Sequence, residues 1–253
     1  MNTDDFEIRV RSKGYVKIPV EGDLFVEHEH VKGVDYSSLG LKGFGSHGSR
    51  FEDCNFSRLQ LDSLSFGDGE VMSEYINCTF DGSRFFSNTL LGRSRFVNCS
   101  FRSIRSSRFQ LSAGDLIDCV FSGRMDSTQI WGRTGPDARI YGDRTNTIDG
   151  NDFSGVDFGD TDFRSGVDLR KQILPTGPDY MIIPDAAQVL ARAYENAATL
   201  DDLESRSSLI RMIERRQEAV SNGQRDLFES KRRIPKHIRG DYERFFDLVA
   251  KQL

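Results

Sequence analysis

The sequence predicts a mainly β protein: a four-sided parallel β-helix, which is a solenoid, with an N-terminal β cap and a C-terminal α-helical region. Three observations predict this fold class. Four cysteines share one motif and lie 24, 21 and 20 residues apart, apolar residues recur every five positions, and a helical period replaces both patterns near the C-terminus. The chain of 253 residues contains 19 Phe, which is enough length and aromatic area to bury a core.

The N-terminal segment, residues 1–30, is predicted to form the β cap. Residues 6–10 and 15–20 alternate apolar and polar side chains on either side of Ser12-Lys13-Gly14, as the strands of a hairpin do. An open coil end is an unpaired strand edge that invites aggregation. We therefore expect the hairpin to cover the first coil.

The cysteine motif consists of an apolar residue, a variable residue, Asp or Asn, Cys, a variable residue and Phe or its equivalent. It occurs at 51–56, 75–80, 96–101 and 116–121. A chain that turns a corner every five residues closes four sides in about twenty, so that successive coils stack about 4.8 Å apart. We expect two internal columns, one of buried reduced thiols and one of aromatic rings: Cys54, Cys78, Cys99 and Cys119, and Phe56, Phe80, Phe101 and Phe121.

These residues resemble the pentapeptide-repeat proteins, whose unit is a small residue, Asp or Asn, Leu or Phe, and two polar residues. The match is close at 156–160 (VDFGD) and 161–165 (TDFRS), and nearly as close at 34–38 (VDYSS). The resemblance covers 31–170 and implies a right-handed, quadrilateral β-helix. Residues 124–148 depart from the repeat, so we expect an irregular, protruding loop there that carries Trp131.

The C-terminal region, 171–253, follows a proline-rich linker and has helical periods. Three helices are predicted. The first lies near 184–198, the second begins at an acidic capping box at Thr199 and stops at Asn222-Gly223, and the third lies near 235–252. Two apolar stripes must pack together on the last coil or across a dimer axis, and because one helix suffices to cover the coil, we expect a homodimer through these helices. They consist of Leu203, Ile210, Ile213 and Val220, and of Ile238, Tyr242, Phe245 and Val249.

Charged residues suggest three surface features. One outer column alternates in sign through Arg50, Glu74, Arg95 and Asp115, which predicts a ladder of ion pairs between coils. An acidic segment contains Asp152, Asp157, Asp160 and Asp162, three of which precede Phe at the repeat position where a carboxylate forms turns. The densest basic run, together with the tryptophan, is the candidate partner-binding set: Lys231, Arg232, Arg233, Lys236, Arg239 and Trp131.

The sequence predicts no enzyme, cofactor or metal site. It contains no nucleophile–base motif, phosphate loop or C-x-x-C pair. Glu27-His28-Glu29-His30 would place two imidazoles on one face of a strand, which is a conceivable metal pair. No third ligand is visible beside them, so we interpret both histidines as exposed surface residues.

The function expected from these features is that of a rigid, non-enzymatic protein–protein interaction scaffold in the cytoplasm of a bacterium. No apolar run reaches the roughly 20 residues that cross a bilayer, and no segment is basic enough for general nucleic-acid binding. The resemblance also implies an alternative, a DNA mimic that binds a type II topoisomerase, DNA gyrase, through the acidic residues named above. Such a mimic needs long acidic faces, whereas residues 31–148 carry 14 basic and 13 acidic residues.

Overall fold

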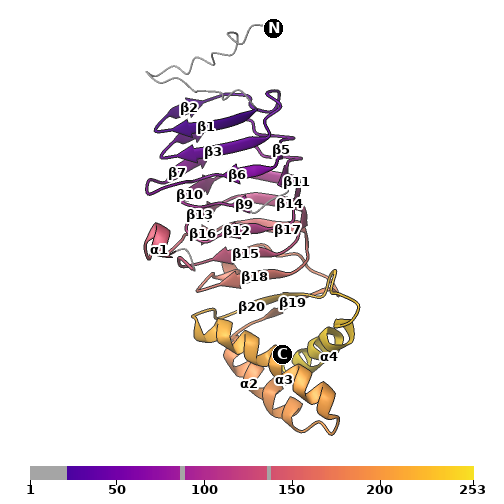
Figure 1. Ribbon diagram of the computed structural model, residues 1–253. Coiled ribbons are helices and arrows are strands. Elements are labelled where there is room, and N and C mark those ends of the chain that lie inside the picture. Colours follow the sequence, from indigo (N-terminus) through magenta and orange to yellow (C-terminus); the bar gives the residue numbers. More distant parts are fainter. Residues whose placement is uncertain (1–21, 86–88, 136–137) are drawn as a thin grey trace.

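The computed structural model describes residues 22–85, 89–135 and 138–253, and shows a four-sided parallel β-solenoid followed by helices (Figure 1). The longest sheet has seven strands: β1 (Asp23–Glu27), β3 (Gly43–His47), β6 (Ser63–Ser65), β9 (Thr89–Leu90), β12 (Phe109–Leu111), β15 (Thr128–Trp131) and β18 (Thr161–Arg164). A second sheet has six: β2 (His30–Lys32), β4 (Arg50–Glu52), β7 (Ser73–Ile76), β10 (Ser94–Val97), β13 (Asp115–Ile117) and β16 (Ile148–Asp149). A third has five: β5 (Gln60–Leu61), β8 (Arg84–Phe85), β11 (Ser100–Ser106), β14 (Val120–Met125) and β17 (Asp152–Phe158).

The fourth side of the first coils is held by single bridges, such as Asn55 to Thr79 and Thr79 to Ser100, and farther along the chain β11, β14 and β17 extend across it. Because the chain turns every five residues, the same side chain of each repeat points inward, and the interior is a continuous apolar core. The fold class expected from the repeat is therefore confirmed.

The thiol and ring columns run along the inside of the solenoid. All four cysteines are buried and free, and the Cys99 thiol donates to the carbonyl of Tyr75 on the preceding coil at 3.3 Å. Burial raises the pKa of the Cys99 thiol, which keeps it protonated. Phe101 stacks between Phe80 and Phe121, with ring centroids 4.6 and 4.7 Å away and planes within 5° of parallel.

The residue before each cysteine occupies a corner with a left-handed backbone. Its φ is 53 or 54° in the four motifs, where the residue is Asp53, Asn77, Asn98 or Asp118. Asp and Asn tolerate this conformation better than other residues with a Cβ, and glycine tolerates it best. Gly33 takes the same corner one coil earlier, with φ 67°. The Asp/Asn position of the motif is thus a requirement of the corner.

The solenoid begins earlier than predicted. Asp23–Glu27 pairs in parallel with Gly43–His47, so the segment before residue 31 already belongs to the first coil and is not wholly a separate cap. The side chains of Leu24 and Val26 are buried and those of their neighbours are exposed. Both a hairpin strand and a strand of a coil can have this alternation. The predicted hairpin at 6–20 lies outside the described residues.

The irregular loop is shorter than predicted. β15 and the last two residues of β14 are regular strand within 124–148, and the departure from the stack lies between β15 and β16, with α1 (Ala138–Tyr141) projecting from the wall (Figure 1). Trp131 therefore lies at the end of β15, half-buried, and not in the protruding loop.

A small antiparallel sheet, and not a helix, covers the last coil. The chain continues through a 3₁₀ turn, η1 (Leu169–Lys171), into β19 (Tyr180–Ile183), which pairs with β20 (Leu227–Ser230). Phe228 of β20 enters the end of the solenoid core and packs on Phe158 and Phe163, with centroids 5.6 and 6.0 Å away. The buried Gln224 side chain accepts from the amides of Gly166 and Val167, as a further strand would.

Three helices pack on the other face of this sheet: α2 (Ala186–Ala198), α3 (Leu203–Ser221) and α4 (Arg239–Ala250). The Asp202 carboxylate caps α3 by accepting from the amide of Ser205, and α3 ends at Asn222. Ile213, Phe245 and Val249 lie fully inside a second core with α2, whereas Leu203 is exposed, contrary to the predicted stripe. The apolar faces that suggested a dimer are largely used within the chain. None of the described helices is long and apolar enough to cross a membrane.

Candidate functional site

A groove of about 560 Å³ lies between the end of the solenoid and the C-terminal helices. The last strand of the seven-stranded sheet, β18, forms one side, β20 forms the back, and the C-terminal half of α3 forms the other side. Trp131, Arg164 and Asp160 line it from the solenoid, and Arg215 and Glu218 line it from α3.

The groove runs beside the outer edge of β18, which β20 partly covers: Phe163 packs on Phe228, and both Thr161 and Phe163 are buried. The amides of Thr128 and Gly132 donate to the carbonyls of Asp160 and Arg164 at 2.9 and 2.8 Å, so these even-numbered positions of β18 face β15. In a parallel ladder the intervening positions face the opposite way, so the backbone groups of Thr161 and Phe163 point away from β15. Within the described residues β18 is the terminal strand of its sheet.

The side chains around this edge are of mixed charge. The Arg164 guanidinium lies 5.0 Å from the Trp131 ring centroid and also pairs with Asp162. Asp160 and Arg215 are exposed and form no ion pair within the part of the chain that the structure describes. Among the described residues, the groove therefore offers one aromatic surface, one unpaired cation (Arg215) and two unpaired carboxylates (Asp160 and Glu218).

A buried ion pair makes the α3 side of the groove rigid. Arg216 donates to both Glu229 oxygens at 2.6 Å, and its guanidinium lies 4.1 Å from the Phe245 ring centroid. Burial alone would lower the pKa of Arg216, but the Glu229 carboxylate outweighs burial and the pKa lies above its usual value. One side chain thus joins α3, β20 and α4.

The predicted basic patch is largely occupied by contacts within the chain. Arg233 donates to Asp126 at 2.6 Å and to Asp157 at 2.7 Å, and Arg232 pairs with Asp157 at 2.5 Å and Asp179 at 3.3 Å. We call these five residues the arginine clasp. Arg232 and Arg233 are therefore not a free partner-binding surface, because they fasten the C-terminal region to the solenoid wall.

The other members of the basic run remain near the surface. Lys236 and Arg239 are exposed, and the Lys231 ammonium lies 5.4 Å from the Phe246 ring centroid. Lys231 and Arg239, together with Arg232 and Arg233, surround a smaller pocket of about 400 Å³, which Asp179 and Glu243 also line.

The predicted acidic residues do not form one acidic face. Asp152 accepts from the amide of Ser154 at 2.9 Å, which is a turn contact. Asp157 belongs to the arginine clasp, Asp162 pairs with Arg164, and only Asp160 stays exposed.

The alternating column has the predicted register but only part of the predicted ladder. Arg50 is opposite Glu74, Glu74 is opposite Arg95, and Arg95 is opposite Asp115. Arg50 and Glu74 form an ion pair at 2.7 Å. Asp115 instead accepts from Arg144, which reaches it from the loop at 2.8 Å. Arg144 of the loop thus takes the place of Arg95 as the partner of Asp115.

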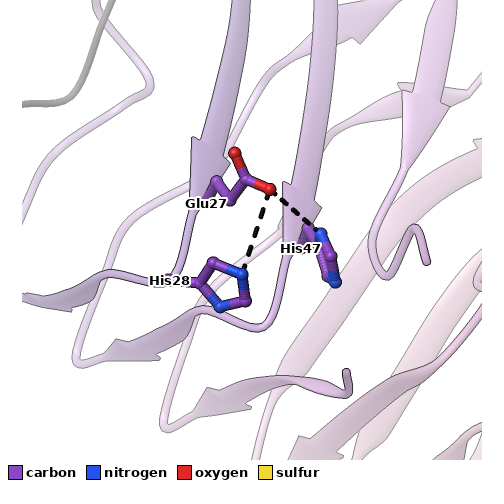
Figure 2. A group of neighbouring side chains, drawn as sticks. All are labelled: Glu27, His28 and His47. Carbon is purple, nitrogen blue, oxygen red and sulfur yellow. Dashed lines mark hydrogen bonds and ion pairs between the residues drawn. The ribbon is translucent and has the colours of Figure 1, made fainter. Parts of the chain in front are cut away.

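The structure brings together a histidine cluster that the sequence analysis missed. His28 and His30 do not share a strand face, because His28 occupies a corner between β1 and β2. His47, twenty residues after Glu27, instead lies beside Glu27 and His28 (Figure 2). The coil period of twenty, applied to position 27, would have predicted this contact.

Comparison with known proteins adds no family assignment. Neither a scan against protein-family models nor a search of curated proteins finds a match to this chain.

Proposed function

We propose that the chain is a pentapeptide-repeat protein that acts as a rigid, non-enzymatic scaffold, and that it docks an extended segment of a partner protein in the groove beside β18. The observation that carries this proposal is the groove itself, which is lined by Trp131 and by unpaired charges on both of its sides.

The chemistry of the groove indicates the kind of segment that fits. Thr161 and Phe163 of β18 are buried, and Phe163 packs on Phe228 of β20, so the side chains that line the groove would hold a bound segment. Specificity would come from side chains: an acidic residue opposite Arg215, a basic residue opposite Asp160 and an apolar or aromatic residue against Trp131. The buried Arg216–Glu229 pair fastens α3 to β20, which forms the back of the groove.

The alternative of DNA mimicry is not proposed, because arginines of the same chain neutralise Asp157 and Asp162. A long acidic face is what a DNA-binding groove recognises. We expect the purified protein not to inhibit gyrase supercoiling.

The test is affinity capture from a bacterial lysate with three full-length proteins: wild type, the groove variant Arg215→Glu with Asp160→Lys, and a control, Arg58→Glu, at an exposed distant corner. We expect one partner to be retained by wild type and the control and lost from the groove variant. With that partner purified, amide exchange at 161–165 should slow in the complex. Equal capture by all three proteins would contradict the proposed site.

A further inference from the structure

We propose that Glu27, His28 and His47 form a binding site for a divalent transition-metal ion, best matched by Zn²⁺. Figure 2 shows the three side chains converging on one space beside the first coil. Glu27 Oε1 lies 3.2 Å from His47 Nδ1 and 3.9 Å from His28 Nε2, and one ligand atom of each residue lies within 4.8 Å of the other two.

These distances are close to those of a tetrahedral zinc site. Ligand atoms bound about 2.0–2.1 Å from Zn²⁺ at tetrahedral angles are about 3.3 Å from one another. The Glu27–His47 contact already has this length, and the Glu27–His28 contact exceeds it by about half an ångström. The three ligand atoms lie within 4.8 Å of one another, and a rotation of the exposed His28 side chain toward both partners would close the triangle.

The backbone places both rings where glycines leave room for them. A Cβ on Gly48 would lie 2.7 Å from His28 Nδ1, and a Cβ on Gly69 would lie 2.9 Å from His47 Nε2. The two rings are 4.8 Å apart between centroids. The imidazoles thus occupy space that the next two coils leave open. A side chain at either glycine would fill that space.

His28 also occupies its corner at a conformational cost. Its φ is 53°, whereas Gly48 takes the same corner one coil later with φ 56°. A histidine with a left-handed backbone is uncommon, and such strain persists where other contacts hold the residue. An ion pair between Glu27 and His47 alone would not require a histidine at position 28, whereas a metal site with three ligands does.

The donor set determines the class of ion. Two imidazole nitrogens and one carboxylate suit Zn²⁺ and other borderline ions, and they are a poor set for Ca²⁺ or Mg²⁺, which prefer oxygen. Three protein ligands leave a fourth position for water on the exposed side. Nε2 of His47 has no hydrogen-bond partner in the described part of the chain, so no outer contact strengthens this ligand. We therefore expect weaker binding than at a closed structural zinc site.

The site joins two coils. Glu27 is the last residue of β1 and His28 follows it, whereas His47 ends β3, and Glu27 is directly opposite His47 in the parallel register. A bound ion would add a cross-link between the first and second coils, where the solenoid has its exposed N-terminal end among the described residues.

The experiment is calorimetric titration of Zn²⁺ into the untagged full-length protein, with Co²⁺ absorption as a second probe of tetrahedral coordination. We expect one site per chain. His47→Gln and His28→Gln should each weaken binding more than 10-fold, since loss of even an outer-shell partner costs 10–100-fold. His30→Gln and His237→Gln are the matched controls and should bind as wild type does.

A second measurement separates binding from a folding defect. In wild type, Zn²⁺ should slow amide hydrogen exchange at 23–32, and in His47→Gln it should not. If His47→Gln fails to fold, Glu27→Gln replaces it, because this carboxylate is exposed. Absence of Zn²⁺ binding in wild type, or equal loss of binding in His30→Gln, would overturn the proposal.

Discussion

Replacing Arg233 by Met tests whether the basic run fastens the C-terminal region to the solenoid or is a free binding surface. The substitution removes two charge-assisted hydrogen bonds, to Asp126 and Asp157, and a third bond to the carbonyl of Asp157 at 2.8 Å. Met keeps the aliphatic stem of the side chain. It also keeps the cost of the left-handed backbone at this position, φ 58°, so the experiment measures the lost contacts.

The magnitude follows from what remains after the substitution. Hydrogen bonds to charged groups contribute about 1.5–3 kcal/mol each when the partner is left unpaired. Here Asp126 keeps Arg124 at 2.8 Å and Asp157 keeps Arg232, so neither carboxylate becomes an isolated buried charge. We therefore expect a loss of about 2 kcal/mol, which is roughly 30-fold in the docking equilibrium.

The assay is urea unfolding followed by far-ultraviolet circular dichroism and by the fluorescence of Trp131, the single tryptophan, which lines the groove next to α3. With a urea dependence of about 2 kcal/mol per molar, the midpoint should fall by about 1 M. The control Lys236→Met removes an exposed cation of the same run and should shift the midpoint by less than about 0.3 M. Equal urea midpoints for Arg233→Met and Lys236→Met would contradict the conclusion that the arginine clasp fastens the C-terminal region to the solenoid.

Two further predictions concern the core and the cap. Phe101→Ala removes a fully buried ring from between two stacked neighbours and should lower the free energy of unfolding by about 3–5 kcal/mol in urea, whereas Phe25→Ala, at a ring that is 43% exposed, should change it by less than about 1 kcal/mol. A loss equal to that of Phe25→Ala would contradict the stacked column. The Arg225 guanidinium holds the pKa of Asp226 below its usual value, so the carboxylate stabilises the fold above about pH 4 and this stability is lost as the pH falls through its folded pKa. In thermal unfolding between pH 6 and 3, Asp226→Asn should be less stable than wild type at pH 6 and should lose less stability on acidification; identical profiles would exclude the contribution.

The repeat could be predicted because its cause is local. A corner every five residues requires an inward apolar side chain and, before each cysteine, a residue that accepts a positive φ, and both requirements are visible in the order of residues. The start of the solenoid was less predictable, because Leu24 and Val26 alternate as the residues of a free hairpin strand would. Alternation shows which side chains are buried but not which strand lies beside them.

The contacts of the candidate sites differ in how far they could be foreseen. The Glu27–His47 contact obeys the coil period and was open to prediction once the first coil was placed correctly. The contact between Arg233 and Asp126 spans 107 residues and has no period, so only the packed structure reveals it. The position of Phe228 was equally unpredictable, because nothing in the sequence of its strand indicates that this residue packs into the core of the solenoid.

The arginine clasp limits how this chain can change in length. Coils of a solenoid contact mainly their neighbours, so a duplicated coil can be accommodated wherever both of its faces are equivalent. Arg233 reaches two consecutive coils at once, since Asp126 follows β14 and Asp157 lies on β17, the strand paired with it. A coil inserted between them would move the two carboxylates about 5 Å further apart and leave one without the guanidinium. Gene duplication can therefore lengthen this protein towards its N-terminal end, while the last two coils and the helical region are inherited as one unit.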